Sequence, residues 1–193
     1  MKFLSIDQSM SSCACVVFDG KEAIFKEVIR TTGAKNIADK SPWVQYFENP
    51  VEQMSFITGK ILDIVESFQV DHVVCESLSF GSAGNATRDL AGLFFCIQLR
   101  LLLEGFRMDQ LHTVAPTSVK SWARGRLPGE QQEFKNEKGK MEKIKMGKDE
   151  MMNVCELLFP GFLKGYTKTG KNGGATDLAD AYLIGRCFLD RYQ

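Results

Sequence analysis

The stretch Lys2-Phe3-Leu4-Ser5-Ile6-Asp7 decides the fold, because it is an apolar segment of strand length that ends in a carboxylate. Two more segments of strand character follow at once, over residues 11–19 and 22–31, and the dipeptide Asp19-Gly20 between them is a turn signal. Three strands joined by short turns predict an antiparallel meander. The chain therefore opens with one half of a β-sheet, and Asp7 lies at the end of its first strand.

Helices and strands alternate beyond the meander, after residues 33–48, which we expect to form a loop. Apolar side chains recur at helical spacing from Pro50 to about Phe68, and proline suits a first helical turn. We expect further strands at 72–76 and 110–115, and further helices at 87–104, around 118–123, at 148–158 and at 175–192. This order predicts an α/β fold with a five-stranded mixed sheet, three antiparallel strands followed by parallel ones, flanked by helices.

The composition is that of one soluble globular domain spanning residues 1–193, with 44% apolar and 25% charged residues. None of the six cysteines forms a C-x-x-C pair and there are only two histidines, which argues against a zinc site. Unpaired cysteines in apolar segments are typical of a reducing cytosol, and the apolar runs are too short to span a membrane. We therefore expect a cytoplasmic protein with no membrane partner.

Basic residues gather in the second half of the chain, although the formal net charge is zero. Residues 120–148 carry nine basic and four acidic side chains, and residues 161–174 carry three lysines and no acid. Such a distribution is typical of a protein that binds the DNA backbone, although a charge run is more often a solvated face. Because residues 125–148 are rich in Gly, Lys and Glu, we expect a mobile basic loop there.

Four carboxylates are the candidate site: Asp7, Glu76 at the end of another apolar strand, and Asp177 with Asp180 on one face of the last helix. Acids drawn together from distant parts of a chain usually hold a hard divalent cation. Two Mg²⁺ ions could activate a water and stabilise the leaving oxygen in phosphodiester hydrolysis. The alternatives are structural: Asp177 as a helix N-cap with Asp180 in the first turn, and Glu76 as a solvated rim residue.

The chain resembles the RuvC-type Holliday junction resolvases of the ribonuclease-H-like superfamily, in particular the divergent members found in bacteriophages. The four acids fall where that family has its first-strand aspartate, its fourth-strand glutamate and its D-x-x-D motif. Ala115-Pro116-Thr117-Ser118-Val119-Lys120 resembles the family's P-x-x-V-K segment, and Lys148 resembles a second family lysine. The sequence departs from the family at Gln8, where proline is common, and in the long segment between Lys120 and Lys148.

The resemblance implies a homodimeric endonuclease that cuts a four-way DNA junction by paired symmetric nicks. Asp7, Glu76, Asp177 and Asp180 would bind two Mg²⁺ ions per active site, with Mn²⁺ as the other metal that the sequence allows, and Asp7 would bridge both ions. Lys120 and Lys148 would neutralise phosphate charge. Two alternatives stay open: a related nuclease for flaps or RNA–DNA hybrids, and a non-catalytic junction-binding dimer.

Further DNA contacts are expected from Phe80, on a Gly/Ser loop after Glu76, and from Arg124 and Arg126 in the basic stretch. Phe80 could wedge against an unpaired base or fold onto the core, whereas we expect Trp122 to pack. The helix over 87–104 is too apolar all round for a surface helix, so a twofold dimer would bury its outer face. The alternative is an internal helix in a monomer.

Overall fold

The computed structural model describes residues 1–78, 84–137 and 139–192, without the side chains of residues 85, 86 and 192. Its centre is a mixed six-stranded sheet in the order β4-β3-β2-β1-β5-β6. The strands are β1 (Lys2–Asp7), β2 (Ser12–Asp19), β3 (Glu22–Thr32), β4 (Gln45–Tyr46), β5 (His72–Glu76) and β6 (Leu111–Val114). β1, β2 and β3 are antiparallel neighbours, and β5 and β6 continue the sheet parallel to β1. The predicted meander and parallel half are confirmed.

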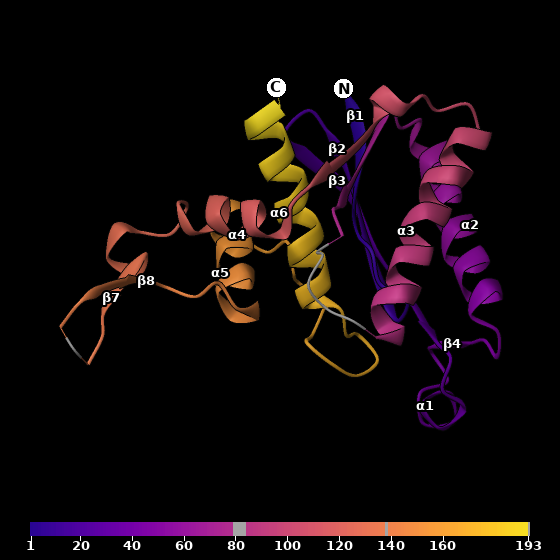
Figure 1. Cartoon of the computed structure of the whole chain (residues 1–193), viewed down its shortest axis with the longest axis horizontal. Helices are drawn as coiled ribbons and strands as arrows, with labels where there is room; N and C mark the ends of the chain where they lie inside the picture. Colours follow the sequence, from indigo (N-terminus) through magenta and orange to yellow (C-terminus); the bar gives the residue numbers. More distant parts are fainter. Residues whose placement is uncertain (79–83, 138, 193) are drawn as a thin grey trace.

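Helices cover both faces of this sheet (Figure 1). One face carries α2 (Pro50–Phe68) and α3 (Asn85–Leu103), and the other carries α4 (Pro116–Arg124), α5 (Lys148–Leu158) and α6 (Ala175–Tyr192). None of the helices in the described part of the chain is long and apolar enough to cross a bilayer. All six cysteines are free, and five of them are buried, as expected of small apolar side chains.

The structure corrects the prediction of a loop over residues 33–48. This segment holds α1 (Lys35–Lys40) and the two-residue strand β4. β4 pairs in parallel with the end of β3 and gives the sheet its sixth strand. The α1 helix is one and a half turns long and has no buried residue. A segment this short and this exposed has no apolar periodicity from which the sequence could predict it.

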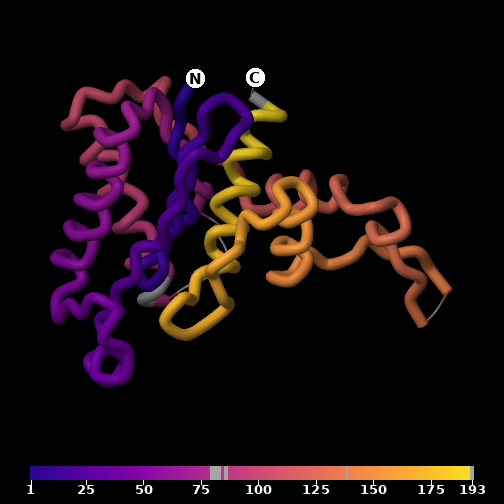
Figure 2. Tube along the Cα trace, turned by 180° about the vertical axis from the view of Figure 1, so that it is seen from behind, coloured from indigo at the N-terminus to yellow at the C-terminus, as the bar shows by residue number. Residues whose placement is uncertain are grey.

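A second correction concerns residues 125–148, which form a hairpin on a short stem. The stem begins with the 3₁₀ turn η2 (Gly129–Gln131), and β7 (Glu133–Lys135) pairs with β8 (Met141–Lys143). We call residues 129–145 the arm. It extends away from the sheet in both views (Figures 1 and 2). Buried Leu127 and Met146 flank it, so its two ends are fixed to the body. Its mobility stays a prediction.

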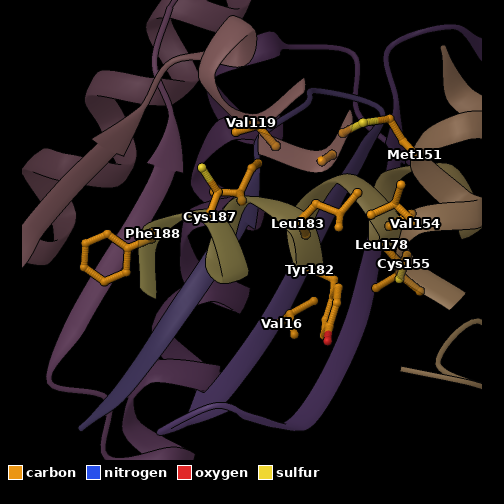
Figure 3. Close-up of a cluster of buried hydrophobic side chains, with 14 of the residues drawn as sticks. Val16, Val119, Met151, Val154, Cys155, Leu178, Tyr182, Leu183, Cys187 and Phe188 are labelled. Carbon is orange, nitrogen blue, oxygen red and sulfur yellow. The ribbon is translucent and has the colours of Figure 1, made fainter. Parts of the chain in front are cut away.

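The two faces of the sheet carry separate apolar cores, because alternate residues of each strand point to opposite sides. Leu4, Ile6 and Cys75 pack toward α2 and α3. Phe3, Val16 and Val74 pack on the other side, with α6. Figure 3 shows part of this second core: Tyr182 of α6 lies next to Val16, and Val119 and Met151 come from α4 and α5. The α6 helix is thus enclosed between the sheet and two other helices.

The α6 helix approaches the sheet closely at Gly185. A Cβ at this position would lie 2.4 Å from the Phe18 ring, so only glycine fits this distance between helix and strand. Phe18 itself stacks on Phe3, with ring centroids 4.8 Å apart. One turn earlier, Ser5 Oγ on β1 donates a hydrogen bond of 2.6 Å to the Ala181 carbonyl. These contacts fix the height of α6 above β1 and β2.

Candidate active site

Asp7 and Glu76 lie side by side because β1 and β5 run in parallel register. Ile6 pairs with Cys75, so the next residue on each strand is the acid at the strand's carboxyl end. Phe3 and Val74 face α6, and the twofold repeat of a strand puts Asp7 and Glu76 on that same face. The sheet therefore directs both carboxylates toward the N-terminal part of α6.

Gln8 fixes the backbone of Glu76 directly. Its amide nitrogen donates to the Glu76 carbonyl at 2.5 Å, and its amide oxygen accepts from the Glu76 backbone N–H at 3.2 Å. The Gln8 side chain is buried. The residue that departs from the family pattern thus extends the pairing of β1 with β5 by one more step and holds Glu76 next to Asp7.

The α6 helix supplies the other two acids from its first two turns. It begins at Ala175, so Asp177 is its third residue, and the N-cap alternative for Asp177 is wrong. Ser12 Oγ at the start of β2 donates to Asp177 Oδ2 at 2.5 Å. Asp180 lies one turn further along the helix, on the side of Asp7 and Glu76. The last helix and the central strands therefore bring acids from both ends of the chain together.

A cavity of about 290 Å³ opens between these elements, lined by Asp7, Glu76 and Asp180 with Lys120, Pro116, Val119, Met151 and Ile184. Lys120 comes from α4, so the segment around Pro116 that follows β6 is part of the site. A larger hollow of about 390 Å³ lies between β3 at Phe25 and the segment around Phe162, and Lys26 is the one charged residue in its lining among the described residues. The chemistry of the lining therefore singles out the acid cavity.

Burial and mutual repulsion raise the pKa values of Asp7, Glu76 and Asp180. Burial, reinforced by the charges of Asp180, Glu76 and Asp177, raises the pKa of Asp7 well above its usual value. Burial and the charge of Asp180 raise the pKa of Glu76 to about 7, against the opposing effect of Lys120. Burial and Asp177 raise the pKa of Asp180 to about 6, although Lys120 and Lys148 act to lower it. Perturbation of this kind is typical of functional sites.

Carboxylate oxygens are the ligands that a hard divalent cation prefers. A bound cation would offset both the burial and the mutual repulsion that raise these pKa values. Across residues 1–78, 84–137 and 139–192, no three His, Cys, Asp or Glu side chains stand ready as ligands of a single ion. Mg²⁺ is usually held by one or two carboxylates together with waters and substrate phosphates. An oxygen-only set spread over two ions therefore fits the residues that are present.

Two lysines flank the acids from different helices. Lys120 lines the acid cavity, while Lys148, the first residue of α5, lies beside Asp177. Both are exposed, and the charges of both act on Asp180. The structure therefore brings together six of the predicted site residues: Asp7, Glu76, Asp177, Asp180, Lys120 and Lys148.

Arg124 and Arg126, two further predicted DNA contacts, lie outside this cluster. Arg124 Nε donates to the Ile144 carbonyl at 3.0 Å and so fastens the base of the arm. Arg126 forms an ion pair of 2.5 Å with Asp190 and stacks on Trp122, which is buried as expected. Both arginines have structural contacts, and their DNA contacts stay predictions. Phe80 lies outside the described residues.

The sequence analysis did not predict that Gln8 and Ser12 contribute to the site. Both act through a neighbour, since Gln8 holds the Glu76 backbone and Ser12 holds the Asp177 carboxylate. The pairing partners lie 68 and 165 residues away in sequence. For Gln8 the only signal was its departure from proline, and for Ser12 there was none.

Comparison with solved structures finds the same arrangement of elements in two RuvC structures and one yeast resolvase. Thermus thermophilus RuvC has a TM-score of 0.62 at 15% identity, over 98% of this chain and 96% of that chain. T. thermophilus RuvC in complex with Holliday junction substrate also has a TM-score of 0.62, at 14% identity, over 97% of this chain and 92% of that chain. This chain has the RuvC fold. The yeast mitochondrial Holliday junction resolvase Ydc2 has a TM-score of 0.52 at 13% identity, over 98% of this chain and 80% of that chain.

The match to RuvC confirms the predicted ribonuclease-H-like α/β fold, with six strands in place of the five expected. No protein-family model and no curated protein sequence matches the chain. At identities of 13–15% the likeness to RuvC and Ydc2 concerns the fold. The activity must therefore be argued from the residues of the site.

Proposed function

We propose that this protein is a metal-dependent endonuclease that resolves Holliday junctions by paired symmetric nicks. The observation that carries the proposal is the convergence of Asp7, Glu76, Asp177 and Asp180 beside Lys120 and Lys148, on a RuvC fold. A protein that only bound DNA would gain nothing from four acids facing a polyanion, because like charges repel. The acids are explained if cations lie between them and the phosphate.

Each side chain has a role in this proposal. Asp7, Glu76, Asp177 and Asp180 would together hold two divalent ions. Bound ions would supply a water activated for attack and charge stabilisation of the leaving oxygen. Mg²⁺ is the expected metal and Mn²⁺ its substitute. Lys120 and Lys148 would neutralise the phosphate from either side of the acids.

The proposed partner is branched DNA, in line with the T. thermophilus RuvC structure that holds a Holliday junction substrate. The lysines on the two sides of the acids and those of the arm supply positive charge for phosphates near to and far from the cut. The arm also exposes Phe134 of β7 and Met141 of β8. A projecting hairpin that carries exposed lysines suits contact with a second duplex arm of a junction better than contact with one linear duplex.

A homodimer is the proposed assembly, with α3 at its interface. Phe95, Leu99 and Leu103 are 60%, 57% and 70% exposed and recur every fourth residue on the outer face of α3. These exposed side chains rule out the alternative of a fully internal helix. An apolar stripe of this kind is typical of an interface, and a twofold axis there would present two active sites to two opposed strands.

The test of the activity is incubation with synthetic four-way junctions in Mg²⁺ or Ca²⁺, with Asp7→Asn as the variant. We expect paired, ligatable nicks in Mg²⁺, binding without nicking in Ca²⁺, and binding without nicking for Asp7→Asn. Preference for a flap or an RNA–DNA hybrid would favour the related nuclease instead. Junction binding without nicking in either Mg²⁺ or Mn²⁺ would favour the non-catalytic dimer.

The dimer is tested by light scattering at micromolar concentration, with Leu99→Glu as the variant and Leu157→Glu as its control. Leu157 on α5 is 56% exposed, close to the 57% of Leu99, but lies on a different face of the molecule. We expect a dimeric mass for the wild-type protein and for Leu157→Glu, and a monomeric mass for Leu99→Glu. A monomeric wild-type protein would refute the proposed assembly.

A further inference from the structure

A polar groove of about 370 Å³ adjoins the acid cluster at Asp177 and is lined by Lys148 and not by Lys120. Its walls come from the start of β2, the end of β3, the first residue of α5 and the loop over 168–174 that leads into α6. Asp177 lies at the boundary, because its carboxylate lines the groove and also acts on Asp7 and Asp180. The groove is therefore continuous with the proposed active site.

The groove is lined by cations and hydroxyl groups. Arg30, Lys148 and Lys168 come from three separate segments, and Ser11, Thr169 and Thr176 add hydroxyls. Of the residues that the structure describes, Asp177 is the single carboxylate in the lining, where it accepts a hydrogen bond from Ser12, and Ile37 and Val44 are the apolar members. Three cations beside one metal-binding acid would favour an anionic ligand with several oxygens, as a phosphodiester has.

The loop that forms one wall of the groove is fixed in place. Arg30 Nη1 donates to the Gly170 and Lys171 carbonyls at 2.5 and 3.2 Å, which ties the loop to the end of β3. Gly174, with φ of +114°, passes so close to β3 that a Cβ there would lie 2.8 Å from the Val28 side chain. No protein group in the described ranges accepts a hydrogen bond from the other guanidinium nitrogens of Arg30, so these nitrogens are available to a ligand.

We infer that this groove binds the backbone of the cut DNA strand one or two nucleotides from the scissile phosphate. The inference rests on the proposed nuclease function and adds the path of the strand: from Lys120, across the acids, to Lys148, Arg30 and Lys168. The continuity with the acids favours a nucleic-acid strand over an acidic peptide. Lys168, which pairs with Asp149 on α5, would exchange this exposed partner for a phosphate.

The test combines protein variants with a neutralised phosphate. Lys168→Ala and Arg30→Gln are assayed on junctions in which one phosphate near the cut, at each position in turn, is a methylphosphonate. We expect one position at which the substitution slows wild-type nicking roughly tenfold, and at which Lys168→Ala loses most of that sensitivity. Lys60→Ala is the matched control, because Lys60 is also an exposed lysine paired with one aspartate, at 3.5 Å, but lies on α2.

Two readouts separate this inference from the proposed function. If the wild-type protein nicks junctions but both variants respond to every methylphosphonate as the wild type does, the groove does not bind the strand, and the nuclease proposal stands. If no nicking occurs, the salt dependence of junction binding in Ca²⁺ decides: a slope smaller by about one for each variant supports the groove. An unchanged slope refutes it. Because Arg30→Gln could loosen the loop, Lys168→Ala is the deciding variant.

Discussion

The acid cluster and the arm are opposites in construction. The cluster places four like charges in a partly buried space, held by the register of two strands, by Gln8 and by the position of α6. The arm places its charges in water, on a two-stranded hairpin with all six strand residues exposed. Burying like charges close together costs free energy, so such a cluster indicates a chemical role. Charges exposed to water carry no such cost and indicate at most a general electrostatic attraction to DNA.

The sharpest contrast is expected in nicking rate. Glu76→Gln should reduce single-turnover nicking of a four-way junction by about 100-fold or more, because it removes a proposed metal ligand. A variant of the arm with Lys135, Lys140 and Lys143 changed to Gln should stay within about threefold of wild type at saturating protein. Equal losses in both variants would mean that the arm takes part in the chemistry.

Stability should depend on pH through the cluster and not through the arm. The folded protein raises the pKa of Glu76 from 4.5 to about 7, so it binds this proton more tightly than the unfolded chain. The resulting stability is complete below pH 4.5 and is lost as the pH rises through 7, a change of about 3 kcal/mol for this group. Urea unfolding in EDTA should therefore show a less stable protein at pH 8 than at pH 5.

Glu76→Gln should be more stable than wild type at pH 8 in EDTA, and Mg²⁺ should stabilise the wild-type protein more than this variant. Glu66→Gln, at an exposed position on α2, serves as the control and should follow the wild-type pH dependence. A wild-type protein whose stability rises from pH 5 to pH 8 in EDTA would contradict the raised pKa of Glu76.

Gln8→Met should have a smaller effect, since it keeps the volume of the side chain but removes both hydrogen bonds to the Glu76 backbone. We expect a loss of about 1–3 kcal/mol in unfolding free energy and a higher Mg²⁺ concentration for half-maximal nicking. Gln131→Met, at an exposed position in the arm, should change neither. A destabilised Gln8→Met protein with an unchanged Mg²⁺ requirement would show that Gln8 supports the fold and not the metal site.

The smallest effect is expected in junction binding by the arm. Each lysine that contacts a phosphate contributes about 0.9 to the slope of log affinity against log salt, so the triple arm variant should lower that slope by up to about three. Its melting temperature should match that of the wild type, because the three lysines are exposed. An unchanged slope would show that the arm has a role other than DNA binding.

The strands and the acids could be predicted from the sequence because each depends on a local pattern. Apolar runs predicted β1 and β5, and a carboxylate at the end of each run marked the site. The sequence analysis missed α1 and β4, which are short and bury little, and the β7–β8 hairpin, whose exposed strands show no apolar alternation. It missed the roles of Gln8 and Ser12 because a hydrogen bond across 68 or 165 residues exists only once the chain has folded.

Gly185 has no side chain, yet it affects the position of the acids on α6. The helix α6 is a rigid rod, and Asp177 and Asp180 lie about two turns and about one and a half turns before the point where Gly185 contacts Phe18. Any added methyl group there would lift the rod from the strand and carry both aspartates outward with it. A screen for inactive variants should therefore recover substitutions at Gly185, because this position sets the distance of two carboxylates from the sheet without contacting either of them.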